Sequence, residues 1–417
     1  FIDGMEARAG LLGDVRGNHP DRWRRPTHQG REVELRSVHL VLQARLADPQ
    51  TDGAALHPRL QALQTELAAT PGLLLLATEA LRSWPRDGGH VREHFGFRDG
   101  LSQPVLRDGQ VAPDPLWDDR MEPGDLLLGH PNGRGGGVTP HQPDPLLDNG
   151  SFLVLRKIAQ RVDRWQQLVQ ATALALDPDL AQRTTQQQLA TRALAAAKLM
   201  GRTTDGAPVG QPALGPVNRF NYDNDAKGTG CPFAAHARRT NPRRRDDKGL
   251  RSAPRLLRRG MSYGPRWAEG EAPDTERGLF FMAYCGSIAE QFEVVQRWVA
   301  GGNSSGVASS QGDPMLGVPQ AGQARWFQWL DEQGQVRRVA LGDDAVTTLR
   351  WGLYLFVPSL AGLGHIAQGP AVAPAPTPEP LAGALYAPGT PAFDDWRQLL
   401  QDSAQRGTLW RRVRDSD

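Results

Sequence analysis

One short segment combines a reactive side chain with an unusual spacing of glycines. Residues 96–104 read GFRDGLSQP, so Asp99 follows Gly96 by three positions and directly precedes Gly100. Glycines permit positive φ angles and let a flat ligand approach the backbone closely. A carboxylate held in such a turn can move a proton for a bound substrate. Asp-Gly is also a common turn dipeptide, so the alternative for this segment alone is a plain surface turn.

Three further segments follow in order along the chain. Residues 231–243 read CPFAAHARRTNPR, residues 256–264 read LLRRGMSYG, and residues 278–284 read GLFFMAY. Together with the Asp99 segment, they resemble the haem-site motifs of the dye-decolourising peroxidases. The resemblance extends from Gly4 to about Leu360. One local departure is Ala237, where the family usually has a β-branched residue.

The resemblance implies a role for each marked residue. His236 would be the axial ligand of a haem iron, and Arg238 would bind a haem propionate through its guanidinium fork. Asp99 would lie above the iron on the open face, and Arg258, two residues before a glycine, would be the distal arginine. The residues implied for the wall of the distal pocket are Leu279 and Phe281.

The chemistry of Asp99 and Arg258 matches the needs of peroxide cleavage. A base must carry a proton from the near to the far oxygen of hydrogen peroxide, and a fixed positive charge must stabilise the departing hydroxide. Asp99 can do the first and Arg258 the second. The alternative is that the two residues form only a structural ion pair.

A haem-ligating histidine should donate its second ring N–H to a carboxylate or a carbonyl. The helix expected after Tyr284 offers Glu290 and Glu293 for this role. The sequence does not choose between them, and a solvent-exposed helix face is the alternative for both.

The bulk composition excludes several classes of protein. The 417 residues carry a net charge of +2, and no apolar run is long enough to span a bilayer. The two cysteines, Cys231 and Cys285, are too few for a disulfide framework and indicate a reducing compartment or indifference to oxidation. Neither belongs to a Cys-x-x-Cys-His motif, so any haem must be bound non-covalently.

Alternating and apolar patterns predict strands at residues 33–46, 73–77, 151–157, 278–285 and 350–357. Helical spacing predicts helices at residues 54–69, 160–175, 180–199 and 287–300. Residues 104–148 are irregular and rich in Pro, Gly and Asp, which is typical of a boundary. The Pro/Ala tract at 370–380 indicates a surface loop of polyproline character.

These elements predict an α+β fold. The resemblance implies two ferredoxin-like halves, each an antiparallel sheet with packed helices, with haem held mainly by the second. We therefore expect an N-terminal half at residues 1–147, with the distal Asp loop, and a C-terminal haem-binding half at 148–417. The segment Gly4–Asp14 resembles a motif from inside the family's first half, so we expect further chain before Phe1.

Two other sites suggested by the sequence are less favoured. The arginines between Arg238 and Arg245 lack the interleaved aromatic residues of a single-strand nucleic-acid site, and two aspartates follow at once. The glycine-rich segment at 133–137 lacks the Gly-Lys-Ser/Thr ending of a phosphate loop. Eleven tryptophans could include a surface radical site, near Trp267, Tyr263 or Trp351 for example, but most tryptophans belong to the core.

The resemblance implies a haem b peroxidase that reduces hydrogen peroxide through a ferryl intermediate and oxidises dyes, phenolics or other small aromatic one-electron donors. An alternative is a haem-handling protein that delivers haem or removes its iron, with little peroxidase turnover. A scaffold protein without cofactor is a second alternative. We expect no nucleic-acid or membrane partner and a cytoplasmic location, and a homo-oligomer is compatible with the sequence.

Overall fold

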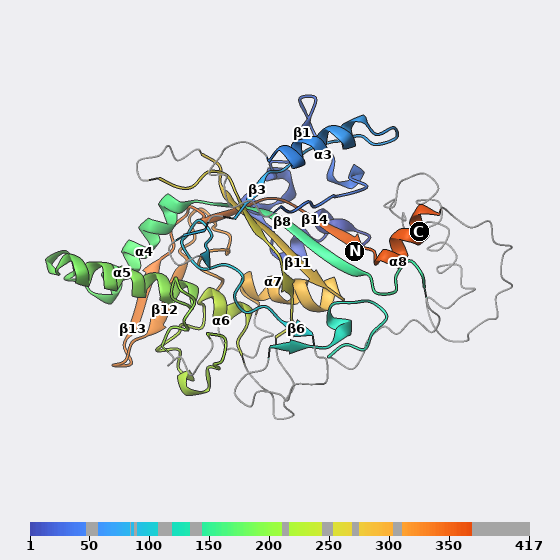
Figure 1. The fold of residues 1–417 in the computed structure, drawn as a ribbon. Coiled ribbons are helices and arrows are strands. Elements are labelled where there is room, and N and C mark those ends of the chain that lie inside the picture. Colours follow the sequence, from blue (N-terminus) through green and yellow to red (C-terminus); the bar gives the residue numbers. More distant parts are fainter. Residues whose placement is uncertain are drawn as a thin grey trace.

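The computed structural model describes residues 1–46, 57–83, 85–86, 90–106, 119–133, 144–210, 217–243, 253–268, 275–302 and 311–368. At its centre is an antiparallel sheet with the strand order β14-β8-β11-β10-β3, in which β9 also pairs with β11 (Figure 1). The strands of this sheet are β3 (Leu81–Arg82), β8 (Ser151–Gln160), β9 (Leu257–Arg258), β10 (Met261–Tyr263), β11 (Gly278–Cys285) and β14 (Thr347–Val357). Helices pack against the sheet, so the chain has the expected α+β fold.

Smaller pairs of strands lie around this sheet. They are β1 (Thr27–His28) with β2 (Arg31–Glu32), β4 (Pro85–Arg86) with β5 (His90–Val91), β6 (Val105–Leu106) with β7 (Arg120–Met121), and β12 (Trp326–Leu330) with β13 (Val336–Ala340). The α-helices are α1 (Gly4–Ala7), α2 (Ala9–Leu12), α3 (Pro58–Ala69), α4 (Val162–Leu176), α5 (Thr185–Met200), α6 (His236–Thr240), α7 (Glu293–Val299) and α8 (Leu360–Ala367).

Local sequence explains the two longest helices. In α5, the Thr184 side chain accepts from the Gln187 amide and the Gln187 side chain accepts from the Thr184 amide, which forms a capping box. The helix ends at Gly201, whose φ of 89° is the left-handed conformation that glycine adopts most easily. In α4, Trp165 and Leu168 lie on the buried face, as the helical spacing predicts.

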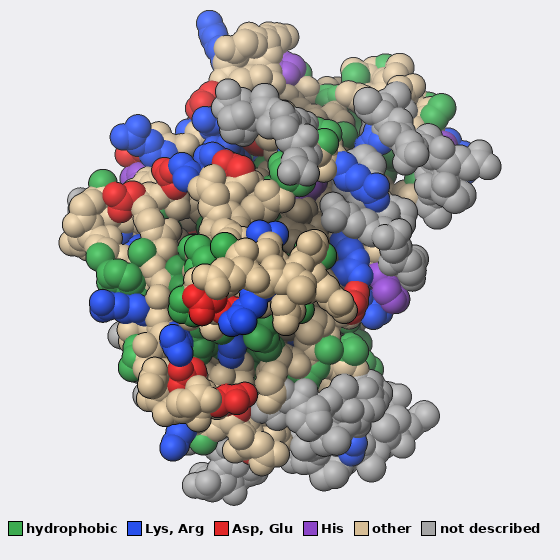
Figure 2. All heavy atoms as spheres, turned by 90° about the vertical axis from the view of Figure 1, so that its left-hand side faces the viewer, with side chains coloured by type: hydrophobic (Ala, Val, Ile, Leu, Met, Phe, Trp, Pro, Cys, Tyr) green, Lys and Arg blue, Asp and Glu red, His purple; other side chains and the backbone are tan. Residues whose placement is uncertain are grey.

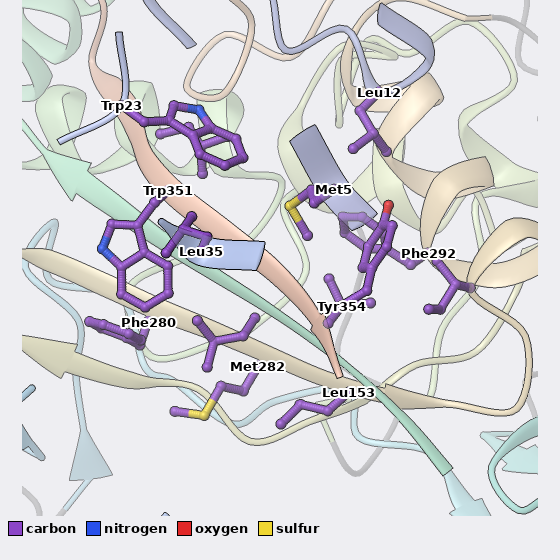
Figure 3. Packing of buried hydrophobic residues seen from close by; sticks show 14 of the residues in the cluster. Met5, Leu12, Trp23, Leu35, Leu153, Phe280, Met282, Phe292, Trp351 and Tyr354 are labelled. Atoms are coloured by element: carbon purple, nitrogen blue, oxygen red, sulfur yellow. The ribbon is translucent and has the colours of Figure 1, made fainter. Parts of the chain in front are cut away.

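The first core cluster joins the N-terminal segment to the central sheet (Figure 3). Met5 and Leu12 from the first two helices pack with Phe292 and Tyr354, while Trp23 contributes to the same cluster near Trp351. Residues from both predicted halves therefore share one hydrophobic core. The boundary between 147 and 148 stays a prediction.

The second core cluster positions the segments with candidate functional residues. It packs α4 and α5 against the β12–β13 hairpin through Trp165, Leu199 and Phe327. Its other members include Phe97, Ala234 and Met315. Phe97 lies two residues before Asp99, Ala234 two residues before His236, and Met315 two residues after Asp313. One well-packed cluster thus fixes three segments that are far apart in the sequence.

Several predicted elements are confirmed and others are wrong. The strand at 278–285, the helices at 160–175 and 180–199, and the strands at 151–157 and 350–357 are found, with ends shifted by a few residues. The helix predicted at 287–300 begins as a π-helical turn, Ile288–Phe292, before α7.

The strands predicted at 33–46 and 73–77 are wrong. Residues 35–37 form a 3₁₀ turn, and the segments 38–46 and 73–77 are not hydrogen-bonded into a sheet among the described residues. Their apolar side chains stay exposed at Leu40, Leu42 and Leu74, so a β-type pattern found no partner strand. The Pro/Ala tract at 370–380 and residues 134–137 of the glycine-rich segment lie outside the described residues.

Two observations bear on broad properties of the chain. Where the structure is described, it contains no helix that is both long and apolar enough to cross a membrane. Basic and acidic side chains are interspersed on the face that Figure 2 shows, which is the side of α5 and β13 in Figure 1.

Candidate active site

The Asp99 turn is held by backbone hydrogen bonds to one nearby and one distant segment of the chain. The Asp99 amide donates to the Val91 carbonyl, and the Arg98 amide donates to the Thr204 carbonyl, both at 2.9 Å. Gly100, at a φ of 79°, donates its amide to Asp99 Oδ1 at 2.7 Å. The carboxylate is therefore fixed by its own turn and stays half-buried.

Two arginines hold the residue that follows this turn. Ser102 adopts a φ of 55°, which is costly for a residue with a Cβ atom. Its hydroxyl accepts from Arg202 Nη2 at 2.7 Å and from Arg243 Nη2 at 3.3 Å, and it donates to Asn218 Oδ1 at 3.0 Å. These contacts stabilise the strained backbone beside the Asp99 turn, and sequence reasoning did not identify them.

Gly206 lies beside Leu101, directly after the Asp99 turn, in a conformation that favours glycine. Gly206 has a φ of 99°, and a Cβ atom there would overlap the side chain of Leu101. Any larger residue at 206 would be strained at this φ and would have to displace the end of the Leu101 side chain.

Arg258 is connected to the same turn in two ways. Its backbone amide donates to Gln103 Oε1 at 3.0 Å, and its Nη2 donates to the Leu101 carbonyl. Burial lowers the pKa of the Arg258 guanidinium, and the negative charge of Asp99 acts in the opposite direction. The fold thus brings together two sequence-predicted site segments that are more than 150 residues apart.

The pocket-wall residues share a sheet face with Arg258. Side chains alternate along β11, so Leu279, Phe281 and Ala283 point to one face. The register pairs Ala283 with Arg258, which places the arginine on that face as well. Leu279 and Phe281 are only half-buried, whereas Phe280 and Met282 on the other face belong to the core. This arrangement matches an apolar wall beside a cationic group.

His236 begins α6 and is oriented by a buried carboxylate. Its Nδ1 lies 2.6 Å from Asp313 Oδ2, and the Asp313 side chain has no exposed surface. The amides of Met315 and Leu316 both donate to Asp313 Oδ1 at 2.9 Å. A carboxylate at Nδ1 favours the tautomer with a proton there, which leaves Nε2 with a lone pair for a metal ion.

The ionisation of Asp313 is favoured in spite of its burial. Burial alone would raise the pKa of this carboxyl, but attraction to His236 and the hydrogen bonds from His236 and the two amides lower the pKa below its ordinary value. Asp313 is therefore an anionic partner for His236 at neutral pH.

The two glutamates considered for this role are placed elsewhere, so the prediction of Glu290 or Glu293 is wrong. Glu293 is buried and accepts from Arg8 Nη2 at 2.5 Å and from the Tyr354 hydroxyl at 3.2 Å. Glu290 is exposed, and its amide donates to the Ser287 hydroxyl. The prediction failed because Asp313 belongs to an irregular turn 77 residues after His236. The one local signal was an Asp-Pro pair, which is typical of a turn.

Arg238 lies in a buried cluster of its own. Its Nη1 donates to Asp225 Oδ2 at 2.8 Å and to the Cys231 carbonyl at 2.6 Å, and Nη2 donates to the Asp225 carbonyl at 2.8 Å. The guanidinium also lies over the rings of Tyr222 and Phe233. These contacts favour a structural role and give no support to the expected propionate contact.

The described residues include no group of three or more His, Cys, Asp or Glu side chains that could hold a metal ion. A haem iron needs only one protein ligand, because the porphyrin supplies four nitrogens. The lone pair on His236 Nε2, fixed by an anionic partner at Nδ1, suits that chemistry. Both cysteines are buried, and neither forms a disulfide bond.

In comparisons with known proteins, the similar proteins found are dye-decolorizing or Dyp-type peroxidases. Residues 183–310, which include His236 and Arg258, match the family model described as "Dyp-type peroxidase, C-terminal". The chain is 32% identical over 309 residues to dye-decolorizing peroxidase msp1 of Mycetinis scorodonius, which covers 66% of this chain and 56% of that protein. It is 32% identical over 329 residues to the multifunctional dye peroxidase DyP2 of an Amycolatopsis species, which covers 72% of this chain and 66% of that protein.

Solved structures show the same similarity. An ancestral D-type dye decolorizing peroxidase superposes with a TM-score of 0.65 at 27% identity, covering 87% of this chain and 79% of the other. DyP2 from Amycolatopsis superposes with a TM-score of 0.61 at 26% identity, covering 87% and 76%. The chain spans 56% to 66% of the length of the two curated relatives above.

Proposed function

Because the chain belongs to the dye-decolourising peroxidase family, we propose that it is a haem b peroxidase that reduces hydrogen peroxide and oxidises small aromatic or dye-like one-electron donors. The observation that carries this proposal is the 2.6 Å hydrogen bond between His236 Nδ1 and the buried Asp313, which frees Nε2 for iron. His236 would hold the haem non-covalently, with Leu279 and Phe281 against its open face. When bound, the haem supplies the redox chemistry with peroxide and with the donors.

Asp99 and Arg258 would divide the work on peroxide between them. Asp99 would accept a proton from one peroxide oxygen and return it to the other, so that the leaving group departs as water. Arg258 would stabilise the negative charge that develops on the departing oxygen. Its two contacts to the Asp99 turn, through Leu101 and Gln103, keep the base and the cation in a fixed relation.

The organisation into halves follows from the same assignment. We propose that residues 1–147 supply the distal carboxylate and that residues 148–417 supply the haem ligand, the distal arginine and the pocket wall. The shared core around Met5 and Trp351 would keep the two parts in register. Cys231 and Cys285 form no disulfide bond, which is compatible with work in the reducing cytoplasm.

The absorption spectrum of the haem-reconstituted protein, before and after one equivalent of hydrogen peroxide, tests the proposal. We expect a Soret band of five-coordinate histidine-ligated haem, a rapid spectral change with peroxide, and a return to the starting spectrum after two equivalents of a one-electron donor. A haem-handling protein would instead bind haem and show slow bleaching or loss of iron without donor-dependent recovery. A protein without a Soret band after reconstitution would contradict the proposal outright.

A further inference from the structure

A hollow lies on the opposite face of the sheet from Arg258. Its volume is about 480 Å³, within the range of small-molecule pockets. The floor is formed by Leu257, Tyr284 and Val357, from β9, β11 and β14. Since these strands belong to the hydrogen-bonded central sheet, the floor is a rigid surface.

The walls of this hollow carry both apolar and cationic groups. Leu126 and Leu127 contribute apolar surface, and the exposed arginines Arg45 and Arg259 contribute two guanidinium groups. Arg45 donates to the Arg259 carbonyl, so the two arginines are neighbours. Among the described residues, neither arginine lies within ion-pair distance of a carboxylate, and the Tyr284 hydroxyl has no hydrogen-bond partner.

The strand register places this hollow directly behind Arg258. Leu257 pairs with Tyr284 and Arg258 pairs with Ala283, so the side chains of Tyr284 and Arg258 point to opposite faces of the sheet. Arg259 Nη1 also donates to the Arg258 carbonyl at 3.0 Å. A molecule in the hollow would be separated from the candidate active site by the thickness of the sheet.

We propose that this hollow binds a small aromatic carboxylate. The ring would pack on Tyr284 and Leu257, and the carboxylate would pair with Arg45 and Arg259, whose guanidinium groups suit planar anions. Resting on the proposed function, the bound molecule is a phenolic electron donor. Each donor loses one electron and its hydroxyl proton, and two donors convert one hydrogen peroxide to two waters.

The test uses two probes of the same shape and different charge. Binding of 4-hydroxybenzoate and of neutral 4-hydroxybenzamide to the haem-loaded protein is measured by equilibrium dialysis without peroxide. Replacing both arginines, with Arg45→Gln and Arg259→Gln, should weaken 4-hydroxybenzoate binding about tenfold and leave the amide unchanged. Tyr284→Leu should weaken both probes, because it removes the aromatic surface. Arg31→Gln, an exposed arginine in the β1–β2 hairpin, is the matched control and should change neither.

Three results would overturn the proposal. They are equal binding of 4-hydroxybenzoate to the wild type and the double variant, equal affinity of the wild type for the two probes, and equal weakening by Arg31→Gln.

The kinetics separate the proposal from the peroxidase function. The double variant should raise KM for 4-hydroxybenzoate and leave kcat and the KM for the amide unchanged. If binding behaves as expected but no donor supports peroxide reduction, the peroxidase function fails and the binding site stands. If peroxide is reduced with an unchanged KM, the donor role fails and the peroxidase function stands.

Discussion

His236 and Arg258 are both oriented by hydrogen bonds, but the partners differ in charge. His236 Nδ1 faces the fully buried carboxylate of Asp313, whereas the Arg258 guanidinium donates to the neutral Leu101 carbonyl. An anionic partner makes a histidine a stronger electron donor to a metal ion. Neutral acceptors orient an arginine and leave its positive charge available. The orientation of His236 thus depends on a charged partner, and the orientation of Arg258 depends on neutral ones.

The contrast between His236 and Arg258 would fail most completely if His236 were not the ligand of the haem iron. His236→Ala should remove nearly all bound haem, because it removes the imidazole nitrogen that we propose as the protein ligand of the iron. Haem per protein after reconstitution is measured by the pyridine haemochrome assay. His130→Ala, at a half-buried histidine that contacts Asn149, is the control and should retain full haem. A His236→Ala protein with full haem and an unchanged Soret band would assign the ligand elsewhere.

Removal of the distal charge should produce the next largest effect. Arg258→Leu should slow the reaction with peroxide by roughly 10² to 10³, the usual cost of losing an electrostatic contact to a developing charge. Arg258→Lys keeps the charge but not the forked geometry, so it should recover only part of the rate. Stopped-flow absorbance after mixing with peroxide gives the rate constants. Equal rates in wild type and Arg258→Leu would remove Arg258 from the reaction.

The base is tested separately from the cation by Asp99→Asn. The amide keeps the shape of the turn, including the acceptor for the Gly100 amide, but cannot take up a proton. We expect a loss of roughly 10² or more in the rate with peroxide at every pH. A variant with wild-type rates across the pH range would leave Asp99 with a structural role.

Glu293 is a useful contrast to Asp313 because it is a buried carboxylate that lies outside the candidate site. Burial raises the pKa of its carboxyl, but the hydrogen bond and charge of Arg8 outweigh this and lower the pKa overall. Its stabilisation is therefore present above the unfolded-state pKa of about 4.3 and is lost as pH falls through the lower folded-state pKa. Glu293→Gln should reduce the free energy of unfolding by about 2 kcal/mol at neutral pH. The difference from wild type should shrink below about pH 4.

Chemical denaturation of both proteins between pH 3 and pH 7 measures this difference. The reaction with peroxide should stay within about twofold, since Glu293 pairs with Arg8 and Tyr354 and not with His236. A difference in stability that grows as the pH falls would show that the carboxylate is not stabilised by its ion pair.

Sequence patterns predicted the parts of the fold that are determined locally. The apolar strands β8 and β11 and the amphipathic helix α4 were found within a few residues, because their side-chain spacing matches the geometry of buried elements. The segments 38–46 and 73–77 have a similar pattern but no strand partner among the described residues. Pairing depends on a second segment, and no local pattern reveals whether that segment is in place.

The same limit applies to the site. Motif spacing singled out Asp99, His236 and Arg258, and the fold joins Arg258 to Leu101 and Gln103, which directly follow the Asp99 turn. Asp313 was missed because its role depends on a turn that closes 77 residues after His236. Arg238 matched the motif by position, but the buried Asp225 occupies its guanidinium, which only the tertiary structure shows.

The reduction potential of the bound haem tests most directly whether His236, unlike Arg258, has a charged partner that changes its properties. Asp313→Asn keeps the acceptor for the Met315 and Leu316 amides and removes the charge. The loss of an anionic partner should raise the Fe(III)/Fe(II) potential, because the imidazole becomes a weaker donor. Glu293→Gln and Glu290→Gln should leave the potential unchanged. An unchanged potential in Asp313→Asn, or an equal rise in Glu293→Gln, would contradict the account.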